Sequence, residues 1–138
     1  MALPRAREAR PFYQSAIQRL EDAEFLLEAD RTTGAVYLGG YAVECMLKAL
    51  ILSIVPPGQR ADVLDSFRGA RAHDYEWLRA RYRERGGPTP PMGVAKGFLL
   101  VATWSTNLRY QARATDRIVA ESFLKAARDI IDWGDGRL

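Results

Sequence analysis

The most apolar part of the chain is the segment 34–55, GAVYLGGYAVECMLKALILSIV. A helix with apolar residues on nearly all sides is typical of a core helix that has other helices around it. A hydroxyl of Thr32 or Thr33 can cap its start, and Pro56-Pro57-Gly58 ends it because proline cannot continue a helix. We therefore expect one buried helix here, around which the rest of the chain is organised.

The remaining hydrophobic positions predict further helices around this one, because apolar residues recur at spacings of three and four. The predicted segments are a helix of about 20 residues from Pro11, a short piece over 61–67, a helix from His73 or Asp74, one over 92–110, and a last one from Thr115 or Asp116 to Gly134. Short turns between such segments make consecutive helices antiparallel. No alternating pattern predicts a strand.

Two adjacent glycines, Gly39 and Gly40, lie inside the central helix. A glycine in a helix interior costs about 1 kcal/mol relative to alanine, so a pair of them indicates a packing reason. The close approach of another helix is one such reason, and a symmetric partner chain is another.

Two charged residues, Glu44 and Lys48, interrupt the apolar segment. They are four positions apart and therefore lie on one face of the helix, in the favourable order with glutamate first. They form either a local ion pair at the helix edge or part of a semi-buried polar network at a dimer contact. A membrane span is excluded, since each charge costs about 2.5–3.5 kcal/mol at the centre of a bilayer.

Composition describes one ordinary globular domain. The 138 residues are 48% hydrophobic and 27% charged with a net charge of +3, which excludes a disordered chain and permits an acidic partner. We place a flexible basic N-terminus at residues 1–10 and a single domain at 11–138. The N-terminus lacks the apolar core of a signal peptide, so we expect a cytoplasmic protein. One cysteine and one histidine are too few for an ordinary zinc site, and we expect no metal and no cofactor.

Three motifs occur in order along the chain: YAVECMLKALI at 41–51, HDYEWL at 73–78 and WSTNLRY at 104–110. With these motifs the chain resembles the HEPN family of small helical domains. The resemblance covers most of residues 11–133. It implies an all-α fold, an antiparallel up-and-down bundle of four long helices plus one short helix, usually a homodimer. It also implies a role near nucleotides or RNA, in some members with a separate minimal nucleotidyltransferase chain.

Other HEPN proteins are ribonuclease toxins that use an arginine and a histidine separated by four to six residues. Arg68, His73 and Tyr75 form such an R-x4-H-x-Y pattern here. In a metal-independent mechanism His73 would move a proton and Arg68 would hold the phosphate. Tyr75 would correspond to the tyrosine that looks like a modification site in that subgroup. The alternative is structural: His73 only opens a helix, whose free N–H groups its ring or Asp74 satisfies.

Basic residues near the polar part of the central helix are candidates for nucleotide or RNA binding, namely Lys48, Arg71 and Arg109. A polar network of Glu44, Lys48, Asp74 and Arg109 is the structural alternative for the same region. The first functional prediction is thus a dimeric HEPN module that binds a nucleotide, RNA or a nucleotidyltransferase partner. A ribonuclease that uses Arg68 and His73 is the second, and a pure dimerisation module is the third.

Overall fold

The computed structural model describes residues 2–138, and within them all regular secondary structure is helical. The six α-helices are α1 (Arg10–Glu28), α2 (Thr32–Ile54), α3 (Arg60–Ser66), α4 (Tyr75–Glu84), α5 (Met92–Val101) and α6 (Arg117–Asp135). Four short 3-10 helices join them: η1 (Arg7–Ala9), η2 (Pro57–Gln59), η3 (Ala70–His73) and η4 (Thr106–Tyr110). The all-α class is confirmed, and the six α-helices correspond to the six predicted segments, whereas the bundle implied by the family resemblance has five.

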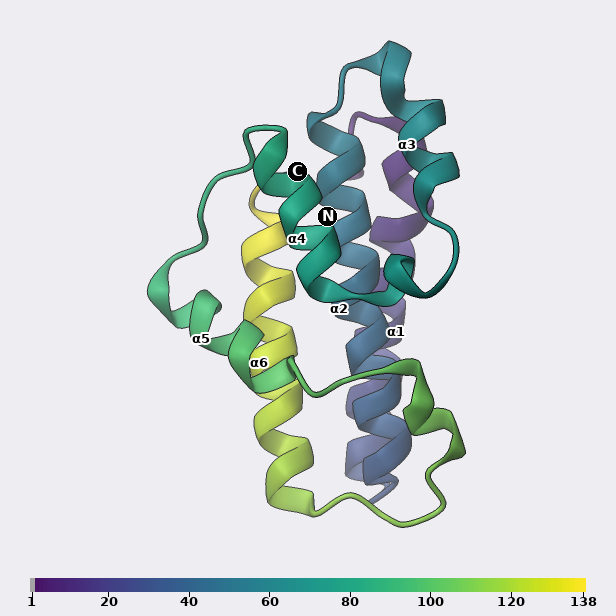
Figure 1. The fold of residues 1–138 in the computed structure, drawn as a ribbon. Helices are drawn as coiled ribbons and strands as arrows, with labels where there is room; N and C mark the ends of the chain where they lie inside the picture. The colour runs from purple at the N-terminus through teal and green to yellow at the C-terminus, as the bar shows by residue number, and fades with distance from the viewer. Residues whose placement is uncertain (1) are drawn as a thin grey trace.

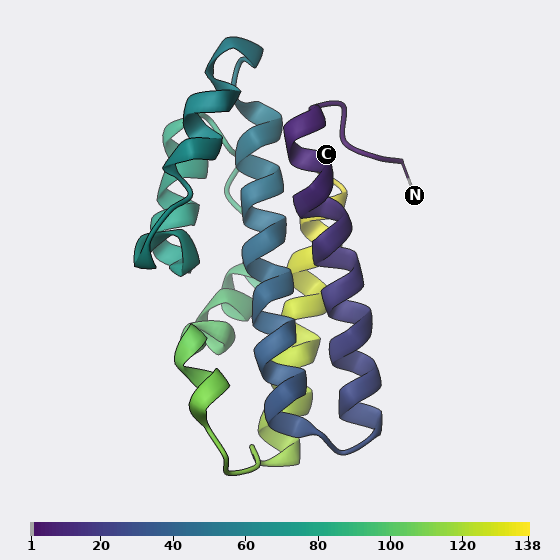
Figure 2. The ribbon, with the colours of Figure 1, turned by 90° about the vertical axis from the view of Figure 1, so that its right-hand side faces the viewer.

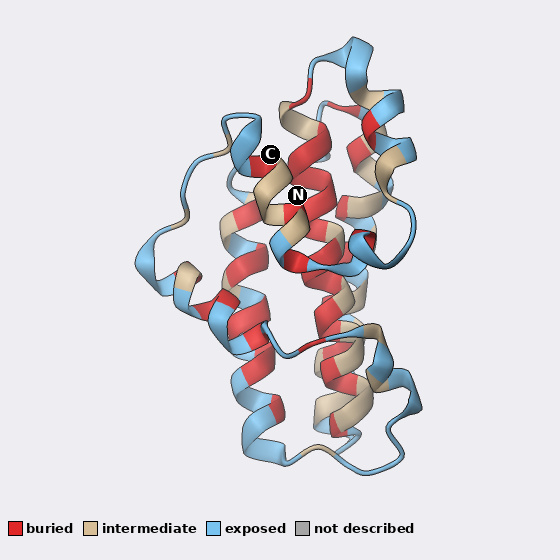
Figure 3. Ribbon diagram, in the orientation of Figure 1, coloured by how far each residue is buried: buried red, intermediate tan, exposed pale blue. Residues whose placement is uncertain are grey.

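Helix α2 is the centre of the fold, as its apolar sequence predicted. The long helices α1, α2 and α6 lie side by side, and α4 packs on the other side of α2 (Figures 1 and 2). Buried residues run along most of α2 and along the inner faces of α1 and α6 (Figure 3). By length and composition α2 could cross a membrane, but 78% of its most apolar window is buried inside the fold. Its apolar surface therefore belongs to the core.

The glycine pair of α2 is explained by close packing on two sides. A Cβ atom on Gly39 would lie 2.5 Å from Cδ2 of Leu124 on α6. A Cβ on Gly40 would lie 2.0 Å from Nε1 of Trp104, in the segment that follows α5. Real Cβ atoms do not come this close to other side chains, so a larger residue would force the Leu124 side chain or the Trp104 indole to move. The predicted close approach is thus confirmed within this chain.

The predicted helix 92–110 was too long, because α5 ends at Val101. The chain then turns back so that the indole of Trp104 lies on Gly40, with its Nε1 donating to the carbonyl oxygen of Tyr37 at 3.1 Å. A continuous helix could not bring this indole to α2. The stretch 106–110 forms the separate 3-10 helix η4.

The capping predictions hold for two helices and fail for one. The side chains of Asp74 and Asp116 accept hydrogen bonds at the starts of α4 and α6. Thr32 and Thr33 do not cap α2. Their hydroxyls instead donate to the carbonyl oxygens of Thr115 and Arg113, and so fasten the chain before α6 to the start of α2.

The N-terminal segment packs on the bundle in the part that the structure describes. Ala6 and Ala9 are buried, and η1 contacts both α1 and α2. Met1 lies outside the described residues. The division into a flexible segment 1–10 and a domain 11–138 stays a prediction.

Candidate functional site

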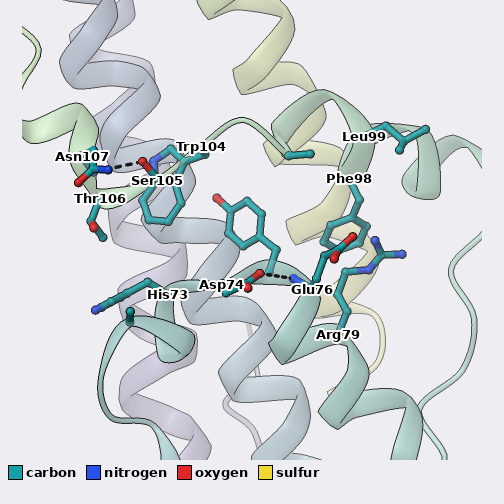
Figure 4. A pocket seen from close by; sticks show the side chains of 13 residues that line it. His73, Asp74, Glu76, Arg79, Phe98, Leu99, Trp104, Ser105, Thr106 and Asn107 are labelled. Atoms are coloured by element: carbon teal, nitrogen blue, oxygen red, sulfur yellow. Dashed lines mark hydrogen bonds between the residues drawn. The ribbon is translucent and has the colours of Figure 1, made fainter.

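A cleft of about 550 Å³ opens beside α2, between two segments that approach this helix from different parts of the chain. One wall is formed by η3 and the start of α4, and the other by the end of α5 and residues 102–107 (Figure 4). Its lining residues include His73, Arg79, Phe98, Trp104, Ser105 and Asn107. Two acidic residues, Asp74 and Glu76, line it as well, so the cleft combines cationic, acidic, aromatic and amide groups.

A buried carboxylate at this place, that of Glu44, binds two basic groups at once. Oε2 accepts from Nζ of Lys48 at 2.9 Å, and Oε1 lies 2.8 Å from Nδ1 of His73. The side chains of Glu44 and Lys48 are only 4% and 8% exposed, whereas that of His73 is 41% exposed. The imidazole is thus fixed on its inner edge and open on its outer edge.

Aromatic side chains support the cleft from below. The rings of Tyr75 and Trp104 are stacked, 5.3 Å apart and 12° from parallel. The Tyr75 hydroxyl donates to the carbonyl oxygen of Gly40 at 2.8 Å, and burial raises the pKa of this phenol well above its usual range. Tyr41 meets the His73 ring edge to face, with centroids 6.1 Å apart. The floor consequently consists of packed aromatic rings, with the Tyr75 hydroxyl neutral and hydrogen-bonded.

Local sequence explains how His73 reaches α2. Gly69 adopts a φ of +76°, a conformation that favours glycine, and the 3-10 turn of η3 follows it. The Asp74 carboxylate then accepts from the backbone N–H of Glu76 and starts α4. His73 is the last residue of η3, so its position is set by the turn before it and the helix after it.

A known protein family matches nearly the whole chain. A model of the HEPN domain matches residues 9–137. The chain belongs to the HEPN domain family. The match confirms the resemblance that the three motifs indicated. Searches among curated proteins and among solved structures gave no match.

The HEPN domain does not bring the two residues of the ribonuclease pattern together. The Arg68 side chain is 80% exposed and binds Asp65, through its carbonyl oxygen at 3.1 Å and its carboxylate at 3.6 Å. His73 lines the cleft and Arg68 does not. Tyr75, the third residue of the pattern, has its hydroxyl buried against Gly40 and so turned away from solvent.

The predicted polar network is formed in part and includes a residue that was not assigned to it. Glu44 and Lys48 pair as predicted, but the third member is His73. Asp74 caps α4 instead. Arg109 lies over the ring of Tyr110, 4.9 Å from its centroid, and both residues are at the surface.

The predicted binding residues also occupy different environments. Lys48 is buried and committed to Glu44. Arg71 is exposed, with its guanidinium 5.1 Å from the centroid of the Trp77 ring. Arg109, at the surface on η4, is likewise outside the residues that line the cleft. Binding by Arg71 or Arg109 stays a prediction.

Sequence reasoning missed Arg79, a half-buried residue on α4 that lines the cleft. Its guanidinium lies 4.1 Å from the centroid of the Phe98 ring, and within residues 2–138 it forms no ion pair or hydrogen bond. Burial and the neighbouring Arg83 lower the pKa of Arg79, though an arginine keeps its charge in proteins. The available signal was its position next to Leu78 and four residues after Tyr75, on the apolar side of α4.

No group of three or more His, Cys, Asp or Glu side chains within residues 2–138 is arranged to hold a metal ion. The side chains that line the cleft offer the following chemistry. They offer a cation at Arg79 and a group that can exchange a proton at His73, while Trp104 and Phe98, only 6% and 4% exposed, present little open ring surface.

Proposed function

We propose that this HEPN domain is a binding module that takes a nucleotide or a short stretch of RNA in the cleft beside His73. The observation that carries the proposal is the cleft itself, in which an unpaired guanidinium and an open imidazole lie near aromatic rings. Phosphates are bound by charged donors, and bases stack on aromatic side chains or on arginine planes.

HEPN domains are typically dimeric or partnered, and we propose that this one acts as a homodimer, alone or with a separate nucleotidyltransferase chain. A cytoplasmic location is part of the same proposal. Light scattering on the purified protein tests the dimer, and a monomer at working concentrations would contradict it. A pull-down with a nucleotidyltransferase chain tests the second partner.

Calorimetry with AMP and with a short single-stranded RNA tests the binding function. We expect Arg79→Gln and His73→Ala each to weaken binding about tenfold or more, because a charged hydrogen bond contributes about 1.5–3 kcal/mol. Arg68→Gln is the matched control, since Arg68 is exposed and outside the cleft. The absence of affinity for both probes would refute the proposal.

A metal-independent ribonuclease is the second candidate, and the contact between Glu44 and His73 favours it. A carboxylate that holds an imidazole is a common arrangement for moving protons. Arg68, however, would have to leave Asp65 to reach the substrate. Cleavage of RNA in the presence of a chelator, leaving 2′,3′-cyclic phosphate ends and lost in His73→Ala and Arg68→Ala, would establish this function.

A further inference from the structure

We infer that Glu44 is a positioning residue, which holds His73 as the tautomer that carries its proton on Nδ1 and leaves Nε2 free for a ligand. The inference concerns the same cleft and rests, for its functional meaning, on the proposed nucleotide or RNA binding. It concerns a residue of the core helix that does not line the cleft itself.

The Glu44 carboxylate lies between two basic groups. Its Oε2 is 2.9 Å from the Lys48 ammonium, and both side chains are almost wholly buried. A buried carboxylate next to an ammonium group stays ionised, because the pair would otherwise leave an uncompensated buried charge. An ionised carboxylate can only accept hydrogen bonds. The 2.8 Å contact with His73 therefore requires a proton on Nδ1.

The other ring nitrogen of His73, Nε2, does not contact Glu44. Within residues 2–138 no group forms a hydrogen bond with Nε2 of His73. With Nδ1 bound inward to α2, Nε2 lies on the open edge of a side chain that is 41% exposed. Figure 4 shows His73 at one side of the cleft, below Thr106 and Asn107. The ring cannot rotate without breaking the contact with Glu44 and leaving the edge of Tyr41.

The consequence is a defined chemistry at the cleft. A neutral His73 offers a lone pair on Nε2, which accepts a hydrogen bond from a ligand hydroxyl or amino group. A protonated His73 offers an N–H there, which binds a phosphate oxygen, while the Glu44 carboxylate stabilises the imidazolium. A nucleotide carries groups of both kinds. The charged residue that contacts the ring is Glu44 from α2, whose other carboxylate oxygen binds Lys48, while the adjacent Asp74 is committed to its cap on α4.

Nitrogen-15 NMR of the imidazole, recorded at a pH high enough to keep it neutral, tests this directly. The sequence has one histidine, so the two ring nitrogens give one unambiguous pair of signals. We expect the Nδ1–H tautomer to predominate, although free histidine in water favours the Nε2–H form. Predominance of the Nε2–H form in the wild type would overturn the inference without any variant.

Two variants make the test specific. Glu44→Leu combined with Lys48→Met removes both buried charges together, a change that buried pairs often tolerate, and is expected to shift the population towards Nε2–H. Arg68→Gln, an exposed change outside the cleft that leaves Glu44 and Lys48 in place, is the control, in which Nδ1–H persists. A double variant that folds, as shown by circular dichroism, and keeps the wild-type tautomer would also overturn the inference.

Binding of AMP separates this inference from the proposed function. If Glu44 acts only through His73, the double variant weakens AMP binding about tenfold, and adding His73→Ala to it causes no further loss. A further loss would show that Glu44 acts by another route and would contradict the positioning role. If AMP and RNA do not bind at all, the proposed function fails, while the tautomer measurement still decides the role of Glu44.

Discussion

Arg68 and His73 lie five positions apart in the sequence but in opposite surroundings in the fold. The Arg68 side chain is in solvent, and within residues 2–138 its polar atoms bind only Asp65, three residues away and itself 75% exposed. His73 binds Glu44, which is 29 positions away and 4% exposed. Exposed ion pairs contribute little, about 0–1 kcal/mol, whereas a buried carboxylate needs its partners. The comparison teaches that the partner's burial, and not the spacing of a motif, decides which residue has a fixed place.

Removing the carboxylate under His73 is expected to have the largest effect. Glu44→Ala leaves the Lys48 ammonium buried without a partner, which lowers the free energy of unfolding by about 3–5 kcal/mol. Asp65→Ala is the counterpart at Arg68 and is expected to change it by less than about 0.5 kcal/mol. Urea denaturation measures both. Similar losses in the free energy of unfolding of Glu44→Ala and Asp65→Ala would contradict the difference between the buried pair at His73 and the exposed pair at Arg68.

The next largest effect is expected at Gly40, where α2 meets the wall that faces His73. Gly40→Ala would place a Cβ atom 2.0 Å from Nε1 of Trp104, so the indole must move and its bond to Tyr37 breaks. Overpacking of this kind costs about 1–3 kcal/mol. Gly93→Ala on α5 is the control, since a Cβ at this position would meet nothing within 4 Å. The free energy of unfolding of this variant is expected to equal that of the wild type or to exceed it slightly. Equal stability of the two variants in urea would contradict the packing at Gly40.

A smaller effect is expected for Tyr75, the residue that follows His73 by two positions. Tyr75→Phe removes the hydrogen bond to Gly40 and lowers the free energy of unfolding by about 0.5–1.5 kcal/mol. Tyr110→Phe is the control, because this ring is 75% exposed. If both variants unfold at the wild-type urea midpoint, the Tyr75 hydroxyl is not held as described. Modification of Tyr75 by a partner enzyme, still a prediction, would require this bond to open.

The smallest effect is expected for Arg68→Ala, which removes only an exposed pair. We expect stability within about 0.5 kcal/mol of the wild type and unchanged affinity for AMP. Thermal unfolding and calorimetry measure the two quantities, with Arg79→Gln as the variant expected to lose affinity. If the wild type cleaves RNA and Arg68→Ala does not, then Arg68 is a functional residue like His73, and the ribonuclease is favoured.

Much of the fold could be predicted from the chain, because its signals are local. The apolar run of α2 and the cap at Asp116 each determine structure within a few residues of themselves. The end of α5 could not be predicted in this way, since it depends on Trp104 reaching Tyr37, 67 positions away.

The candidate site was predicted less well, for the same physical reason. The pairing of Glu44 with Lys48 follows from helix geometry. The contact of Glu44 with His73 depends on the turn at Gly69. The spacing of hydrophobic residues does not predict the φ of this glycine. The unpaired state of Arg79 depends on which carboxylates happen to be near it in space.

Three groups along α2 hold the two walls of the cleft in place. Along a single helix, the Tyr37 carbonyl, the Gly40 carbonyl and the Glu44 carboxylate face Trp104, Tyr75 and His73 in turn. Each wall of the cleft is therefore aligned by its own bonds to α2. Insertions at the exposed residues Pro88 and Thr89, in the loop between α4 and α5, would leave both walls in place, whereas Gly87 in the same loop packs against Tyr82. Relatives with quite different loop lengths could keep the same cleft, and a label or a second domain could be inserted in that loop without disturbing it.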